Sequence, residues 1–160
     1  SEDLDYEMYQ YICEKLKKYG YKHYEISNFA KDGYYSKHNL CYWHNEEYYG
    51  FGLGASSYLN DIRSTNTRSI TKYLQGNMIS SYEKLSKSDK IDYEMILGLR
   101  LLDGVSKRGF EDKYDISLDD VYNIDNLIEN GDIISSSDYI KIPEDKLYVS
   151  NEILINFIEE

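Results

Sequence analysis

The sequence predicts a mixed fold, with an α/β part over residues 1–80 followed by a small α+β unit over residues 81–160. Near the start, a helical pattern, a glycine and a short strand pattern follow one another, which is half of a βαβ unit. In the second part, three helical patterns, a hairpin pattern and a trailing helix follow the order of a winged helix. The net charge changes close to this boundary. Residues 1–88 carry 11 acidic and 11 basic side chains, whereas residues 89–160 carry 18 acidic and 7 basic side chains.

The first element is an amphipathic helix over residues 2–19. Its apolar stripe recurs at helical spacing and consists of Leu4, Met8, Ile12, Leu16 and Tyr19. Gly20 ends the helix. Cys13 lies beside the stripe, so we expect a buried, inert thiol rather than a reactive one.

A short strand over residues 21–27 comes next and ends in polar Glu25, Ser27 and Asn28. Polar side chains at the carboxyl end of a strand are typical of ligand sites in α/β folds, but a loop that solvates itself fits the residues equally well. Asp32-Gly33 then predicts a turn.

The segment from His38 to Tyr58 combines histidines, the only tryptophan, several tyrosines and alternating glycines. Residues 47–58 read as a strand in which Gly50, Gly52 and Gly54 share one bare face. That face predicts either close approach of a planar or nucleotide-like ligand or tight packing of the backbone. His38 is either a ligand or a hydrogen-bonded structural residue, and its spacing to the next histidine matches no structural zinc pattern.

The rest of the chain divides into short elements. We expect a return strand at 61–66, a helix at 69–75 and a Ser- and Lys-rich linker at 77–89. Helices should follow at 90–102, 107–113 and 117–131, then a hairpin at 133–142 and a last helix at 152–158. The third of these helices should begin at Ser117, with Asp120 completing an approximate capping box.

Composition excludes some function classes. The net charge of -11 falls on the second half, and the expected recognition helix at 118–129 is acidic, so we expect no nucleic-acid partner. No run of 18 apolar residues occurs, so we expect no membrane span. Two cysteines are too few for a disulfide framework or a cluster, which indicates a reducing, cytoplasmic setting.

Residues 24–58, YEISNFAKDGYYSKHNLCYWHNEEYYGFGLGASSY, resemble the HemW type of the oxygen-independent coproporphyrinogen III oxidase-like radical SAM family. The tail from EMILGLRLLDG to SNEILINFI is similar to the C-terminal domain of that family. Within the first run, HNLCYW at His38 to Trp43 matches the HNxxYW motif of its heme-chaperone-like members. The tail departs from the family at residues 147–151, LYVSN, where a Leu-Thr-x-x-Gly pattern is usual.

The resemblance implies that residues 1–80 are the last part of a partial TIM-like barrel that binds S-adenosylmethionine (SAM) and a 4Fe-4S cluster. The cluster's three cysteines would lie outside this chain, which would be the C-terminal portion and inactive in radical chemistry alone. The resemblance makes His38 an axial ligand of heme iron, with Tyr42 and Trp43 shaping the pocket. It also places SAM against Gly52, Gly54 and Ala55.

The function implied by the resemblance is that of a chaperone that binds heme and delivers it to heme-accepting proteins. Two alternatives stay open. The first is oxidative decarboxylation of coproporphyrinogen III by the same fold, and the second is an acidic protein-interaction module formed by residues 89–160.

Overall fold

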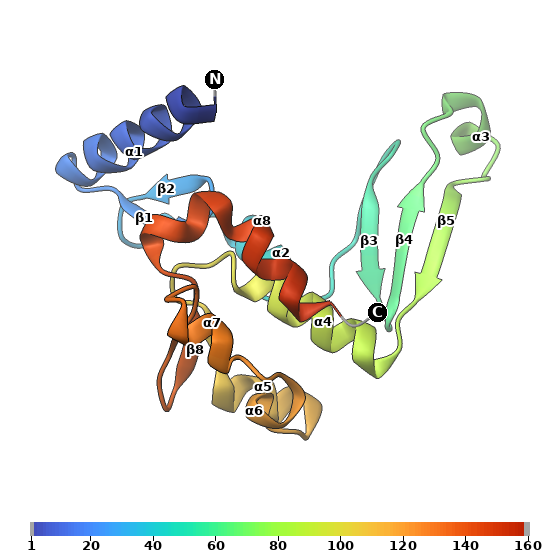
Figure 1. The fold of residues 1–160 in the computed structure, drawn as a ribbon. Coiled ribbons are helices and arrows are strands. Elements are labelled where there is room, and N and C mark those ends of the chain that lie inside the picture. Colours follow the sequence, from blue (N-terminus) through green and yellow to red (C-terminus); the bar gives the residue numbers. More distant parts are fainter. Residues whose placement is uncertain (1, 159–160) are drawn as a thin grey trace.

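The computed structural model describes residues 2–158, which form a mixed α/β structure of short elements (Figure 1). A helix and a hairpin lie at one end, a three-stranded sheet stands at the other, and helices of the second half lie between and below them. The first half contains α1 Glu2–Lys18, β1 Lys22–Glu25, β2 Asn28–Ala30, α2 Lys37–Trp43, β3 Ser56–Leu59, β4 Ile62–Asn66, α3 Ile70–Leu74 and β5 Ile79–Lys84. The second contains α4 Lys87–Gly98, β6 Val105–Ser106, α5 Lys107–Tyr114, α6 Leu118–Val121, α7 Asp125–Glu129, β7 Ile134–Ser135, β8 Tyr139–Lys141, η1 Glu144–Val149, α8 Ser150–Leu154 and η2 Ile155–Phe157.

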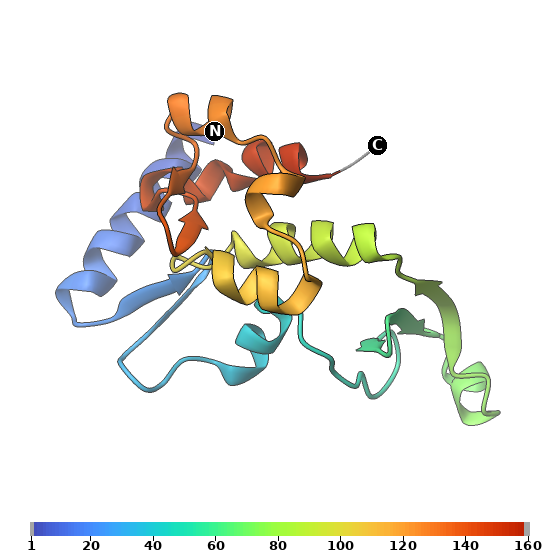
Figure 2. The ribbon, with the colours of Figure 1, turned by 90° about the horizontal axis from the view of Figure 1, so that it is seen from below.

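The strands form three small sheets, with the orders β1-β2, β3-β4-β5 and β6-β8-β7. Every strand pair within residues 2–158 is antiparallel. The expected βαβ half-unit therefore has no parallel partner in this part of the chain, and these residues close no barrel. Figure 2 shows the sheet of β3, β4 and β5 reaching away from the helices.

The hydrophobic core lies in the second half. Its fully buried members come from α4, α5, the β6-β8-β7 sheet and the last helices, and they include Met95, Leu99, Phe110, Ile140, Leu147 and Phe157. The stripe predicted for the helix at 90–102 is confirmed, because Ile91, Met95 and Leu99 are buried and Leu102 packs against the core. Burial of these side chains is the main source of stability for the second half.

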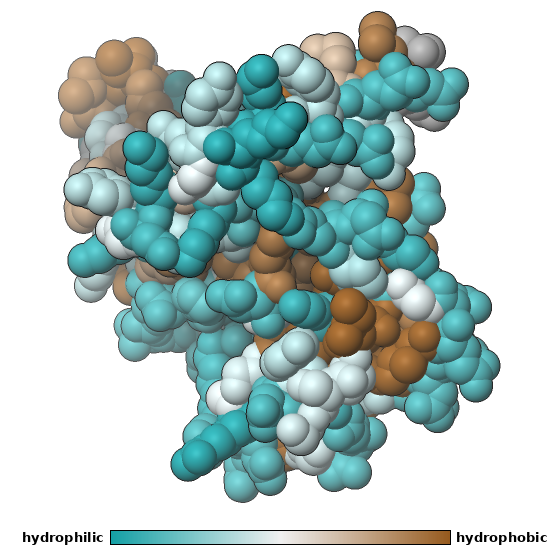
Figure 3. Space-filling model, turned by 90° about the vertical axis from the view of Figure 1, so that its left-hand side faces the viewer, coloured by the Kyte–Doolittle hydropathy of each residue, from teal (hydrophilic) through white to brown (hydrophobic). Residues whose placement is uncertain are grey.

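Helix α1 confirms the predicted helix but not its predicted buried face. Leu4 and Met8 are each 54% exposed, and Ile12 is 45% exposed. The helix instead packs through Tyr6 and Tyr9, whose rings lie 5.4 and 5.1 Å from the ring of Tyr148. Figure 3 views the side on which α1 lies, where apolar residues form separate patches on a mostly hydrophilic face.

The first hairpin is joined to the chain after α4 by backbone hydrogen bonds. The N–H of Ile26 donates to Arg100 O at 3.0 Å, and the N–H of Leu102 donates to Tyr24 O at 3.2 Å. Glu25 is fully buried in this junction, where it accepts from Ser27 N at 3.3 Å and from the amide of Asn28. The sequence allows the polar strand end to be interpreted either as a ligand site or as a loop that solvates itself. The contacts of Glu25 fit the second interpretation, because its carboxylate binds polar groups of its own turn.

Four predicted elements are wrong in part. Residues 49–55 form a turn rather than a strand, and the predicted linker at 77–89 contains β5 and the start of α4. The predicted helix at 117–131 is broken into α6 and α7, and Ser117 makes no side-chain cap. The last helix is preceded by η1 and gives way to η2 after α8. No helix among residues 2–158 is long and apolar enough to cross a bilayer.

Candidate functional site

Helix α2 carries the three ring residues of the HNLCYW segment. The hydroxyl of Ser36 accepts from Asn39 N at 3.3 Å and caps the helix, while Ser36 N donates to the Tyr24 hydroxyl at 3.2 Å. The helix ends at His44, whose N–H donates to Leu40 O at 2.8 Å. His38 therefore lies in the first turn and Tyr42 one turn later on the same face.

His38 and Tyr42 form a contacting pair. The His38 Nε2 and the Tyr42 hydroxyl lie 2.8 Å apart, and the ring centroids are 4.7 Å apart at 72°. His38 is exposed, and its Nδ1 has no hydrogen-bond partner among residues 2–158. Tyr42 packs edge-on against Tyr48, with ring centroids 4.4 Å apart. The arrangement presents an oriented imidazole with one nitrogen open to solvent.

Trp43 faces a different part of the surface. Its ring lies 5.9 Å from the Arg100 guanidinium, and its Nε1 is buried without an acceptor among the described residues. It lines a groove of about 690 Å³ between α2, α4 and α5, together with Phe110, Lys113 and Tyr139. Neither His38 nor Tyr42 lines this groove, so the structure brings His38 and Tyr42 together and sets Trp43 apart.

The glycine segment before β3 is a tight turn rather than a bare strand face. Gly52 and Gly54 have φ angles of +98° and +68°, which side chains with a Cβ rarely adopt. A Cβ on Gly50 would lie 2.0 Å from the carbonyl oxygen of Ser56, so this glycine permits backbone to pack on backbone. The Asn66 amide fastens the turn by donating to the carbonyls of Gly50 and Gly52 at 3.3 and 2.9 Å.

The SAM-facing residues predicted from the resemblance lie in this turn. The N–H of Gly52 donates to the Tyr73 hydroxyl at 3.2 Å, and that of Gly54 donates to Thr67 O at 3.1 Å. Ala55 O accepts from Asn66 N at 2.8 Å. The polar backbone groups of the turn are thus largely used within the chain, while the space beside Gly52 is open.

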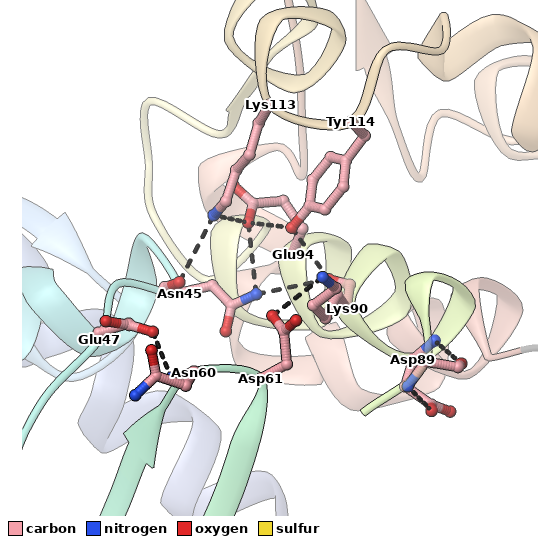
Figure 4. A network of polar contacts seen from close by, with 10 residues as sticks. Asn45, Glu47, Asn60, Asp61, Asp89, Lys90, Glu94, Lys113 and Tyr114 are labelled. Atoms are coloured by element: carbon pink, nitrogen blue, oxygen red, sulfur yellow. Dashed lines mark hydrogen bonds and ion pairs between the residues drawn. The ribbon is translucent and has the colours of Figure 1, made fainter. Parts of the chain in front are cut away.

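A polar network joins α2 to the second half of the chain (Figure 4). Its central residue is Asn45, which is 4% exposed and has a φ of +50° directly after α2. The Asn45 amide lies 3.4 Å from both Lys90 O and Glu94 Oε2 and accepts from an Arg63 Nη at 2.8 Å. Lys113 donates to Glu94 Oε2 at 2.5 Å and to the carbonyls of His44 and Asn45 at 3.4 Å.

The same network perturbs a tyrosine. The Tyr114 hydroxyl donates to Glu94 Oε2 at 2.9 Å and lies 3.1 Å from Lys90 O. Burial, and then the Glu94 carboxylate, raise the pKa of Tyr114 far above its usual value. Sequence reasoning missed this network, because its members are up to 69 positions apart. One local signal existed, since asparagine just after a helix commonly takes a positive φ.

Metal-ligating side chains do not cluster in the described residues, where no group of three or more His, Cys, Asp or Glu could hold an ion. Cys13 on α1 and Cys41 on α2 are half-buried free thiols. Burial raises the pKa of each, which keeps both in the unreactive thiol form. This agrees with the inert thiol expected for Cys13, although its burial is only partial.

Comparisons with known proteins identify related chains. Residues 85–144 match the family model of the HemN C-terminal domain. The heme chaperone HemW of Lactococcus lactis is 40% identical over 163 residues, which cover 99% of this chain and 43% of that protein. The heme chaperones HemW of Bacillus subtilis and Escherichia coli are 36% and 29% identical, and each alignment covers 99% of this chain and 44% of the relative. The chain thus spans less than half the length of these relatives.

A solved structure is also similar. It is coproporphyrinogen III oxidase from Escherichia coli, described as a radical SAM enzyme, with a TM-score of 0.70 over 92% of this chain and 39% of that one. The sequence identity is 16%, so this likeness concerns the fold alone. The sequence relatives carry the family assignment, and they extend over nearly the whole chain. The chain is therefore a homologue of the HemW heme chaperones that matches their C-terminal part.

Proposed function

We propose that the whole protein containing this chain binds heme through His38 and delivers it to heme-accepting proteins. The observation that carries the proposal is the exposed His38 imidazole, held 2.8 Å from the Tyr42 hydroxyl within the HNLCYW segment. Relatives along 99% of the chain are named heme chaperones. Neutral imidazole is a common axial ligand of heme iron, so the residue type fits the cargo.

Tyr42 would orient the ligand. A histidine that binds a metal through one ring nitrogen usually donates its other N–H to a fixed acceptor. The Tyr42 hydroxyl can accept from Nε2, which leaves the lone pair of Nδ1 for iron. The packing of Tyr42 on Tyr48 fixes that hydroxyl in turn. Trp43, at the end of the same helix, would shape the pocket wall from the side of the neighbouring groove.

The division of the chain belongs to the same proposal. Residues 1–80 would be the last part of a partial TIM-like radical SAM barrel, and residues 81–160 a winged-helix-like C-terminal domain. The family match beginning at residue 85 supports this division, as does a core formed by residues 91–157. The two free cysteines accord with a cytoplasmic setting.

SAM and a 4Fe-4S cluster are proposed as cofactors of the whole protein. The described residues offer no ligand set for the cluster, whose ligands would lie outside this chain. For SAM, Gly52, Gly54 and Ala55 remain the proposed contacts. Support comes from the open space beside Gly52, whereas a Cβ at Gly54 would lie in ordinary contact with the Arg68 side chain, 3.4 Å from its Cγ.

Heme titration of the whole protein tests the proposal. His38→Ala should lower heme affinity by at least about tenfold and change the Soret band, because an axial ligand is lost. His44→Ala is the matched control, since His44 is an exposed histidine just beyond the same helix. Unchanged spectra and affinity in His38→Ala, or equal losses in both variants, would overturn the assignment of His38.

A further inference from the structure

Arg63 on β4 is a cation without an acidic partner among the described residues. Its guanidinium lies between two rings, 4.7 Å from the ring centroid of Tyr58 and 4.0 Å from that of Tyr93. One Nη donates to Asn45 Oδ1 at 2.8 Å, while the buried Nε has no acceptor in this part of the chain. A guanidinium held so rigidly keeps donors available for a further acceptor.

Two acids of the adjoining network are already paired with lysines. Lys90 pairs with Asp61 at 2.9 Å, and Lys113 pairs with Glu94 at 2.5 Å. Arg63 reaches this network only through the neutral amide of Asn45. No carboxylate among the described residues forms an ion pair with Arg63, although Glu83 lies opposite it on β5, so its donors stay available to an anion from outside the chain.

Arg63 is also one of the residues that line a hollow on the β3-β4-β5 sheet. The hollow measures about 410 Å³, and seven of its nine lining residues carry a hydroxyl group. Hydroxyl groups can donate to an anion without adding charge. Of these residues, Ser56, Thr65 and Ser81 lie on the same face of the sheet as Arg63, and a guanidinium beside hydroxyl donors is the chemistry of a carboxylate site.

Tyr48 connects this hollow to the proposed heme ligand. It lines the hollow, and its ring packs 4.4 Å from that of Tyr42, which in turn contacts His38. Two successive ring contacts thus separate the imidazole from the edge of the hollow. A porphyrin bound at His38 that projected a carboxylate-bearing arm across Tyr48 would bring that arm toward Arg63.

We propose that Arg63 and the hydroxyl groups beside it bind a propionate carboxylate of heme. The proposal rests on the function proposed above, and it adds the residue that recognises the anionic edge of the porphyrin. Glu83, opposite Arg63 in the register of β5, also lines the hollow and is exposed. The Glu83 carboxylate repels an anion bound in the hollow, so it lowers the affinity of the hollow for a propionate.

The test compares heme with heme dimethyl ester, in which both propionates are esterified, by titration of the whole protein in one solvent. The wild type should bind heme at least about tenfold more tightly than the ester, because a charge-assisted hydrogen bond is lost with the ester. In Arg63→Gln the affinity for heme should fall toward that for the ester, which should itself stay unchanged. Glu83→Gln should tighten heme binding without affecting the ester.

The outcomes separate the two proposals. If neither ligand binds, the proposed function is overturned, and the role of Arg63 falls with it. If the wild type binds both ligands equally, only the role of Arg63 is overturned, and this comparison needs no variant that folds. His38→Ala should weaken both ligands by the same factor and so preserve their ratio. A lower heme affinity in Glu83→Gln would also contradict the proposal.

Discussion

Asn45 offers a sharp test of how the two halves of the chain are joined. It is 4% exposed, lies directly after α2 and has a φ of +50°. Asn45→Gly keeps that backbone conformation accessible and removes only the side-chain contacts. Asn45→Ala removes the same contacts and adds the strain of a Cβ in the left-handed region.

The magnitudes follow from the hydrogen bonds. The bond from Arg63 to Asn45 Oδ1 is 2.8 Å long and involves a charged donor, which is worth about 2 kcal/mol. The two contacts of the Asn45 amide nitrogen are 3.4 Å long and contribute little. Asn45→Gly should therefore lower the free energy of unfolding by about 2 kcal/mol. Asn45→Ala should lower it by about 3 kcal/mol, because the left-handed region costs a further 1 kcal/mol or so.

Urea unfolding measures both changes, and Trp43, the only tryptophan, reports from the helix beside the network. Asn60 is the matched control, since it is exposed, has a φ of +49° and makes no side-chain hydrogen bond within residues 2–158. Asn60→Gly should be nearly neutral and Asn60→Ala should cost about 1 kcal/mol. Wild-type stability in both Asn45 variants would refute the network, and a larger loss for Gly than for Ala would refute the backbone argument.

Three further predictions concern other parts of the chain. Gly50→Ala should destabilise the protein by about 2 kcal/mol in urea unfolding, because its Cβ would meet the Ser56 carbonyl; wild-type stability would contradict this. Burial and Glu46 raise the pKa of Cys41, so iodoacetamide should alkylate it faster in Glu46→Gln, and equal rates would count against that influence. Hydrogen bonds from Ser86 lower the pKa of Asp89, so its stabilising contribution is present above the unfolded pKa near 4 and is lost as the pH falls. Asp89→Asn should therefore reduce the loss of unfolding free energy on the acid side of a stability-versus-pH profile, and an unchanged profile would be inconsistent with this.

Local signals in the sequence predicted several helices but not α2, and they placed some boundaries poorly. The helix at 69–75 has its serine cap and its closing glycine, as α3 shows. Helix α4 begins earlier than predicted because Ser86 and Asp89 form a capping box. That S-x-x-D pattern was readable, but the surrounding serines and lysines favoured a linker. Residues 79–84 of the predicted linker form strand β5, because they find backbone hydrogen-bond partners on β4. Such long-range pairing can override the composition of a segment.

The glycine segment shows why an alternating pattern can mislead. Alternating glycines and apolar residues fit a strand of period two, but the same glycines also permit positive φ angles. The choice between the two is made by the Asn66 amide, which holds two carbonyls of the turn. Nothing near Gly50 in the sequence points to Asn66, so the turn could not be predicted from the segment alone.

The candidate site was predictable only where its residues are neighbours on one helix. His38 and Tyr42 are four positions apart, so a helix over HNLCYW brings them together. The contacts of Arg63 were not predictable, because Asn45 and Tyr93 come from distant elements. A single sequence contains no signal for such pairs.

The position of His38 depends on the second half of the chain as well as on its own helix. Lys113 on α5 donates to the carbonyls of His44 and Asn45 just after α2, and α2 packs on α4, whose Glu94 binds the same lysine. At the other end, Ser36 is held by the Tyr24 hydroxyl, and Tyr24 itself is bonded to Leu102. Both ends of a seven-residue helix are thus anchored to residues beyond position 85. A helix this short has little stability of its own, so the unit formed by residues 85–158 sets the direction in which the imidazole points.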